Sequence, residues 1–251
     1  MKKNLRFTLI FLLLTTTLFS CSKKKDEKSN AEVAYTKAMA SLKDKNYSAA
    51  AEAFSKIDDD FPFSKWAVKA QTMAVYAYYK DEDYPKLVST VDDFIRLNPA
   101  NEAVPYMMYM KGLSFYKQIP EIDRAQDNTH EASITFRELV ARFPADSHSD
   151  DARKKLAYVD EHLAGAKMSI GRYQIKNKNY VGAINNFTEV TERYRATDQV
   201  PEAFFRLTEI YYKLGLQKES VAAFHQLKYF FPQNNWTQLA EKIDPVLFND
   251  K

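Results

Sequence analysis

The chain has 251 residues, 45% of them hydrophobic and 27% charged, with a formal net charge of +3 at pH 7. Three of its 36 basic residues lie in the first twenty positions, so the remainder carries 33 basic and 33 acidic side chains. This balance excludes nucleic acid as the main partner, because such a partner requires a basic face. The single cysteine excludes an internal disulfide, so stability must come from a packed core.

The N-terminal segment has the layout of a secretory signal peptide. Three basic residues precede the uncharged stretch 7–19, and a small residue, Ser20, stands before Cys21. The stretch is shorter than the about 20 apolar residues of a membrane-spanning helix. The site resembles the cleavage site of a bacterial lipoprotein, so we expect removal of residues 1–20 and lipidation of Cys21. An ordinary secretory signal with an incidental cysteine is the alternative.

The next residues predict a flexible tether over 21–30, because positions 22–30 contain no apolar side chain. The run Lys23–Lys25 either contacts anionic lipid head groups or is simply solvated. The acyl chains on Cys21 would provide the membrane anchor, at about 0.8 kcal/mol per buried methylene.

The body of the chain is rich in helix formers and repeats one spacing five times. Three anchors, four and then eight residues apart, recur as Ala50, Phe54, Pro62; Leu87, Val91, Pro99; Ala132, Phe136, Pro144; Ala183, Phe187, Arg195; and Ser220, Phe224, Pro232. A small residue lets two helices approach, the apolar residue one turn later fills their contact, and proline ends the helix. Each unit is therefore predicted to be a helical hairpin that buries its apolar face by stacking on its neighbours.

The spacing resembles that of the tetratricopeptide repeat, most closely in the last unit, from Leu207 to Pro232. The resemblance implies an all-α, right-handed solenoid of about five hairpins. We expect three N-terminal repeats in 31–144, and two further repeats with a capping helix in 145–251. The capping helix is expected around Leu239, Ile243 and Leu247.

Two units depart from the repeat. The third carries an insertion over 119–127, and the fourth ends in Arg195 after a long first helix that runs through 154–164.

Catalytic and metal-binding patterns are missing from the sequence. None of the four histidines stands at ligand spacing in a recognised motif, and there is no glycine-rich phosphate loop or Gly-x-Ser-x-Gly. We expect no enzyme activity, no metal and no cofactor. An enzyme such as a repeat-decorated peptidoglycan hydrolase would need a catalytic domain for which the length leaves no room.

Aromatic residues are abundant, with 16 Tyr and 17 Phe. In this type of solenoid the first helix of each hairpin lines the concave surface, which is expected to carry Tyr35, Met39, Tyr76, Tyr79, Tyr106, Tyr109 and Tyr116. Tyrosine combines a large apolar area with a hydroxyl group, so this set favours a groove for an extended peptide. The alternative is that these side chains pack between hairpins.

A lipid-anchored solenoid of five hairpins resembles the BamD (ComL) family of outer-membrane lipoproteins, over essentially all of the mature chain. The most specific segments are the opening hairpin from Tyr35 to Phe63 and the segment from Tyr106 to Leu113. Asp123, Arg124 and Asp127 lie where that family has a longer insertion. Ser22 after the cysteine is compatible with export to the outer membrane.

The resemblance implies a non-catalytic subunit of the β-barrel assembly machinery, lipid-anchored to the outer membrane and facing the periplasm. The first three hairpins would receive unfolded outer-membrane proteins, and the last two would dock on the barrel-bearing subunit, with other lipoproteins as further partners. We expect Asn186, Glu189 and Arg193 to form one exposed stripe for that docking. Another tetratricopeptide adaptor, such as a pilus-secretin pilotin, is the alternative.

Overall fold

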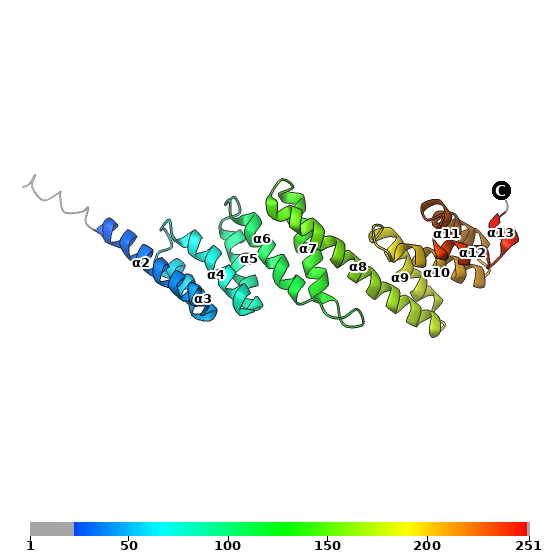
Figure 1. The fold of residues 1–251 in the computed structure, drawn as a ribbon, viewed down its shortest axis with the longest axis horizontal. Helices are drawn as coiled ribbons and strands as arrows, with labels where there is room; N and C mark the ends of the chain where they lie inside the picture. The colour runs from blue at the N-terminus through cyan, green and yellow to red at the C-terminus, as the bar shows by residue number, and fades with distance from the viewer. Residues whose placement is uncertain (1–22, 250–251) are drawn as a thin grey trace, which may run out of the picture. The chain divides into compact units, whose positions relative to one another are not determined.

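The computed structural model describes the backbone of residues 23–249 and most side chains from Asn30 onward (Figure 1). The described part of the chain is helical, without strands. Its helices are α2 (Lys23–Lys43), α3 (Tyr47–Asp60), α4 (Ala67–Asp81), α5 (Tyr84–Leu97), α6 (Val104–Lys117), α7 (Asp127–Arg142), α8 (Ser147–Lys176), α9 (Tyr180–Arg193), α10 (Val200–Lys213), α11 (Gln217–Phe230), α12 (Asn235–Glu241) and α13 (Pro245–Asn249). The predicted all-α fold of consecutive helical hairpins is confirmed.

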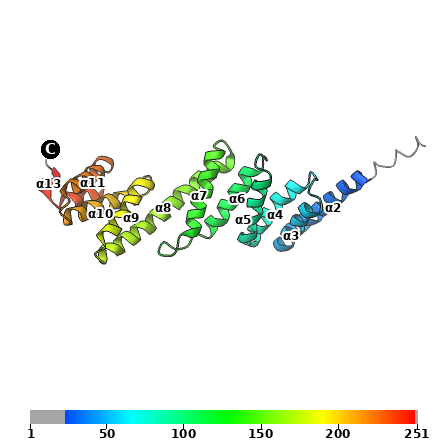
Figure 2. The same cartoon turned by 180° about the vertical axis from the view of Figure 1, so that it is seen from behind.

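The chain forms two compact units, of which the first ends at Met110 and the second begins at Lys111, inside α6. The sequence led us to expect a boundary at 144/145. In the second unit α8 has 30 residues and packs on α7 with its first half and on α9 with its second (Figures 1 and 2). Position 144/145 lies in the turn between α7 and α8, and the division of the repeats there stays a prediction.

The turns α2–α3, α4–α5, α8–α9 and α10–α11 each contain one residue with a left-handed backbone, unlike the longer loop between α6 and α7. The backbone is left-handed at Lys45, Glu82 and Lys178, with φ of 60°, 61° and 60°, and at Gly215 with φ of 75°. After each of the first three comes a capping Asn or Asp whose side chain accepts a backbone N–H of the next helix: Asn46 from Ala49, Asp83 from Lys86, and Asn179 from Gly182. Such a cap satisfies one of the unpaired N–H groups that begin every helix.

The repeated anchors form the core between helices. Ala50, Phe54, Ala183, Phe187 and Phe224 all have no exposed surface. The anchor spacing predicted this burial because residues four apart lie on one face of a helix.

The N-terminal part of the described chain has a different secondary structure from the one that we expected. Helix α2 begins at Lys23, so the segment 21–30 is not a flexible tether from that residue onward. Lysine and glutamate favour helix, and the packed part of α2 offers a nucleus on which the helix extends. Cys21 and the signal segment 1–20 lie outside the described residues.

The closing segment forms two short helices, α12 and α13, in place of the single capping helix that we expected. Proline at 245 cannot continue a helix from α12, because it lacks an N–H and clashes with the preceding turn. Asp244 instead starts α13, where its side chain accepts the N–H groups of Val246 and Leu247 at 3.1 and 2.9 Å. Both helices pack on α11.

A close helix contact in the second unit gives a stability prediction. A Cβ on Gly171 would lie 2.5 Å from Cε1 of Phe187, whose ring is fully buried and cannot move aside. For Gly171→Ala we expect overpacking of about 1–3 kcal/mol to outweigh the gain of about 1 kcal/mol in helix propensity. Urea denaturation should therefore show a less stable protein.

Gly165 on the same helix is the matched control. There a new Cβ would meet only the end of the Ile122 side chain, at 3.2 Å, and Ile122 is 40% exposed and can shift. Gly165→Ala should leave stability unchanged or raise it by up to about 1 kcal/mol. If both variants changed stability alike, the contact between Gly171 and Phe187 would not determine the spacing of α8 and α9.

Candidate functional site

A partly exposed apolar strip lies on the first unit, over α2, α4 and the start of α6. Met39 and Tyr76 are 37% and 38% exposed, and both line a hollow of about 570 Å³. Tyr106 is more deeply placed: burial raises the pKa of its phenol to about 12, and the neighbouring Tyr76 phenol acts in the same direction. We call Met39, Tyr76 and Tyr106 the tyrosine strip.

Other predicted peptide-binding tyrosines have packing roles. The Tyr35 ring lies 5.4 Å from Phe54 and 4.8 Å from Trp66, and burial raises the pKa of its hydroxyl group. The Tyr79 ring lies 6.4 Å from that of Tyr84 across the turn between α4 and α5. Both side chains therefore pack against rings outside their own helices, and their part in peptide binding stays a prediction.

Tyr109 and Tyr116 complete the predicted set. Tyr109 is half-buried. Tyr116 belongs to the second unit, where its ring lies 6.3 Å from Phe136 and 5.5 Å from Tyr158, with the Lys155 ammonium 5.8 Å from its centre. Of the seven predicted residues, Met39 and Tyr76 line one hollow, and the Tyr76 phenol contributes to the raised pKa of Tyr106.

The sequence analysis missed several residues beside the strip. Tyr47, Lys43 and Lys45 line the same hollow from the turn between α2 and α3. Tyr47 stands in the sequence three residues before the first anchor, Ala50, and no motif there indicated a binding site. Its part in the hollow depends on how α2 and α4 lie together, which no local pattern specifies.

The stripe predicted for partner docking on α9 is only partly exposed. Asn186 donates a hydrogen bond to Oε1 of Gln174 on α8 at 3.0 Å. Glu189 pairs with Lys167 of α8 at 2.7 Å and with Arg193 at 3.3 Å. The expectation of one exposed stripe is wrong for Asn186 and Glu189, because α8 supplies polar partners that cover them. Arg193 is exposed over 70% of its side chain.

A second hollow, of about 480 Å³, lies in the second unit between the ends of α9, α10 and α11. It is lined by Arg195, Phe204, Phe230 and Phe231, among others. Phe230 and the adjacent Tyr229 are 58% and 79% exposed. The sequence analysis did not single out this run of three aromatic residues, although three in succession at a helix end are a visible signal.

The insertion in 119–127 is a hydrogen-bonded loop. His162 of α8 donates from Nε2 to the carbonyl of Pro120 at 2.7 Å, and Gln126 donates to the carbonyls of Glu121 and Arg124, both at 2.9 Å. Asp123 and Arg124 are exposed at its tip.

Residues 23–249, the part of the chain that the structure describes, lack two features. Within that range, no group of three or more His, Cys, Asp or Glu side chains is arranged to hold a metal ion. None of the helices there is long and apolar enough to cross a membrane.

Most of the chain is similar in sequence to known proteins. Residues 27–228 match the family model YfiO, described as outer membrane lipoprotein. Outer membrane protein assembly factor BamD of Rickettsia prowazekii is 34% identical over 237 residues, covering 92% of this chain and 94% of that protein. The BamD of Caulobacter vibrioides is 32% identical over 235 residues, covering 91% and 77%.

One solved structure is a weaker match. PilW, described as a widely conserved type IV pilus biogenesis factor, aligns with a TM-score of 0.26 and 13% identity, covering 83% of this chain and 97% of PilW. A score this low carries no argument for a pilus role. The family match and the two BamD relatives decide the matter: the chain belongs to the YfiO family of outer membrane lipoproteins, the family of the assembly factor BamD.

Proposed function

We propose that this protein is a lipid-anchored subunit of the machinery that assembles β-barrel proteins in the outer membrane. It faces the periplasm, binds unfolded outer-membrane proteins through its first unit and docks on the barrel-bearing subunit through its second. The name shared by its relatives, outer membrane protein assembly factor, supports the general role. The single observation that supports substrate binding is the tyrosine strip.

The chemistry of the strip suits a segment of an unfolded barrel. Transmembrane strands alternate apolar and polar residues and carry aromatic residues near both membrane interfaces. Met39 and Tyr76 offer apolar surface to such a segment. Met39 contributes a flexible thioether and Tyr76 an aromatic ring. The hydroxyl groups of Tyr76 and Tyr106 can meet backbone groups of an extended chain. Apolar contact and hydrogen bonding would thus be combined in one place.

Docking on the partner subunit is proposed to use α9. Arg193 projects into solvent, while its neighbour Glu189 is already shared with Lys167. A guanidinium with one weak internal partner retains donors for a carboxylate of another protein, to which it can bind through two parallel hydrogen bonds. Asn186 and Glu189 hold α9 against α8 and position Arg193, so their role is indirect.

Photocrosslinking tests the division of labour between the units. A photoreactive amino acid replacing Tyr76 should label a peptide that copies the last strand of an outer-membrane barrel. The matched control replaces Glu192, an exposed residue of α9 in the second unit, with the same group. We expect labelling at position 76 and background at 192. Equal labelling would contradict substrate binding at the strip, and labelling at neither would leave only the scaffold role.

A further inference from the structure

The turn between α3 and α4 presents a phenylalanine entirely to solvent. Phe63 has a fractional exposure of 102%, the highest among the large hydrophobic side chains that the structure describes as exposed. The turn beneath it is fixed by hydrogen bonds: the N–H of Ser64 donates to the carbonyl of Phe61 at 3.0 Å, and the N–H of Trp66 to Oγ of Ser64 at 3.3 Å. The ring is thus held outward by an ordered turn.

The surroundings of Phe63 are amphipathic. Trp66 packs on Tyr35, with the ammonium groups of Lys65 and Lys69 at 5.4 and 5.3 Å from its ring centre. Aromatic rings with lysines beside them are enriched at membrane–water interfaces, where the ring enters the boundary and the ammonium groups stay in water.

Charge around the turn is nearly balanced. Two exposed lysines, Lys65 and Lys69, are matched in number by two exposed carboxylates at the end of α3, Asp59 and Asp60. Attraction to anionic lipid would therefore be weak, and any contact with a bilayer would rest on the apolar ring.

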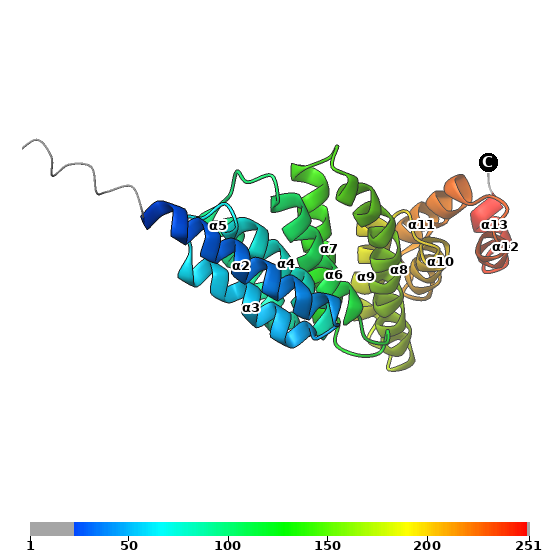
Figure 3. The same cartoon turned by 60° about the vertical axis from the view of Figure 1, so that its left-hand side comes forward.

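The turn between α3 and α4 lies at the same edge of the first unit as the start of α2. Helices α2 and α3 are joined at 44–46 and lie side by side, so the end of α3 returns to the level of the early part of α2 (Figure 3). The described helix starts at Lys23, about 10 Å of helix axis before Asn30. The described start of α2 and the turn that carries Phe63 therefore lie at the same edge of the unit.

A second apolar side chain shares this edge. Leu97, the last residue of α5, is 62% exposed. Since α4 packs on both α3 and α5 and short turns reverse the chain between them, α3 and α5 run in the same direction and end at the same edge.

We propose that Phe63 is a second membrane contact, which enters the head-group boundary of the bilayer that holds the acyl chains of Cys21. This inference rests on the proposed lipid anchor. An anchor at one point leaves the first unit free to rotate over the bilayer, whereas a contact at Phe63 restricts that rotation. The tyrosine strip is then presented at a limited range of orientations to the membrane.

The single cysteine of the chain makes the test specific. In the proposed mature lipoprotein the Cys21 sulfur would be bonded to the diacylglyceryl group, so Lys65→Cys would introduce the only free thiol for a polarity-sensitive dye. The labelled, acylated full chain is incorporated into vesicles of phosphatidylethanolamine and phosphatidylglycerol, with and without lipids that carry a quencher in the head-group region. We expect the dye to report an apolar environment and to be quenched by the lipids.

A second substitution isolates the native ring. Adding Phe63→Ser to the labelled chain should lower the ratio of membrane-contacting to free orientations about tenfold, because the free energy of burying the phenylalanine ring is lost. The matched control carries the label through Gln233→Cys, an exposed loop residue of the second unit, with and without Phe230→Ser. Neither control should be quenched.

The outcomes separate the two proposals. Flotation of the chain with the vesicles reports the anchor alone and should be unchanged by Phe63→Ser. A chain that floats but gives no quenching at position 65, or quenching that does not depend on Phe63, overturns the membrane contact and leaves the anchor intact. A chain that does not float overturns both. A dye at position 65 that responds only when another protein of the assembly complex is added would make this turn a protein-binding surface, which also contradicts the proposal.

Discussion

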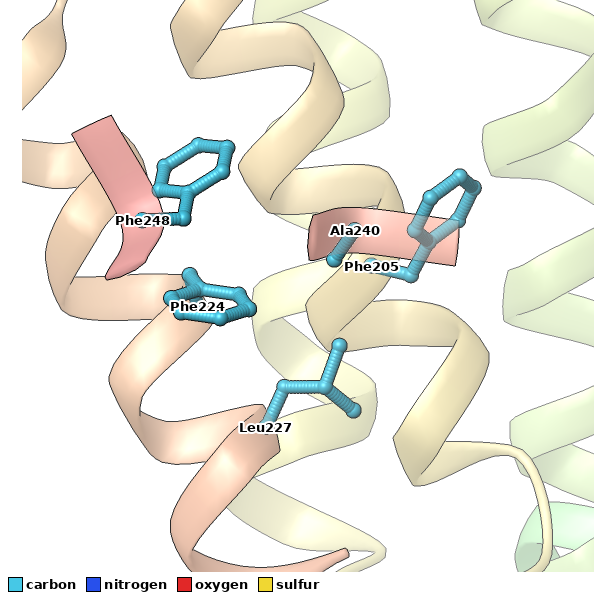
Figure 4. Close-up of a cluster of buried hydrophobic side chains, with 5 residues drawn as sticks. All are labelled: Phe205, Phe224, Leu227, Ala240 and Phe248. Carbon is cyan, nitrogen blue, oxygen red and sulfur yellow. The ribbon is translucent and has the colours of Figure 1, made fainter. Parts of the chain in front are cut away.

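Replacing Phe224 with alanine should lower the free energy of unfolding by about 3–5 kcal/mol. The Phe224 ring has no exposed surface and stacks on Phe248 with ring centres 4.7 Å apart. With Phe205, Leu227 and Ala240 these rings form the cluster that closes the second unit (Figure 4). Removing the ring leaves a cavity that helices held on several sides cannot fill, and chemical denaturation would measure the loss.

Tyr229→Ala on the same helix is the control, because Tyr229 is 79% exposed and its removal should cost no more than about 0.5 kcal/mol. Repeat proteins are stabilised by contacts between neighbours, so the loss should be greatest at the C-terminal end. Hydrogen exchange of Phe224→Ala should accelerate first in α11, α12 and α13. Equal stability of the two variants would show that the cluster contributes little to the second unit.

Replacing Cys21 with serine should abolish lipid anchoring of the protein in the outer membrane. The reason is chemical: serine lacks the thiol that accepts the lipid, and without acyl chains only weak contacts with the bilayer remain. Cell fractionation should find the variant as an unprocessed precursor or in the soluble periplasmic fraction.

The control for this result is Ser20→Ala, which keeps a small residue before the cysteine and should preserve both cleavage and membrane association. Mass spectrometry of the wild-type protein should show an acylated N-terminal cysteine. An intact Met1, or a mature chain with a free thiol at Cys21, would contradict the anchor.

The sequence alone determined the helical hairpins and the residues at their centres. Ala50 with Phe54, and Ala183 with Phe187, are fully buried, as their spacing predicted. Such positions are predictable because the α-helix has a fixed period, so residues four apart share a face whatever surrounds them. The break before Pro245 was not predicted, although proline ends a helix through its own backbone.

The exposure of the candidate functional residues was decided by the tertiary structure. Tyr35 and Tyr76 occupy first helices of successive hairpins, yet Tyr35 is covered by Trp66 and Phe54 while Tyr76 borders a hollow. Glu189 is covered because Lys167 of α8 stands opposite it. Burial of a side chain depends on neighbours that are distant in sequence, and the helical period says only which face it shares. The sequence therefore located the faces of this protein, and the packing of one helix on the next decided which of their residues remain accessible to a partner.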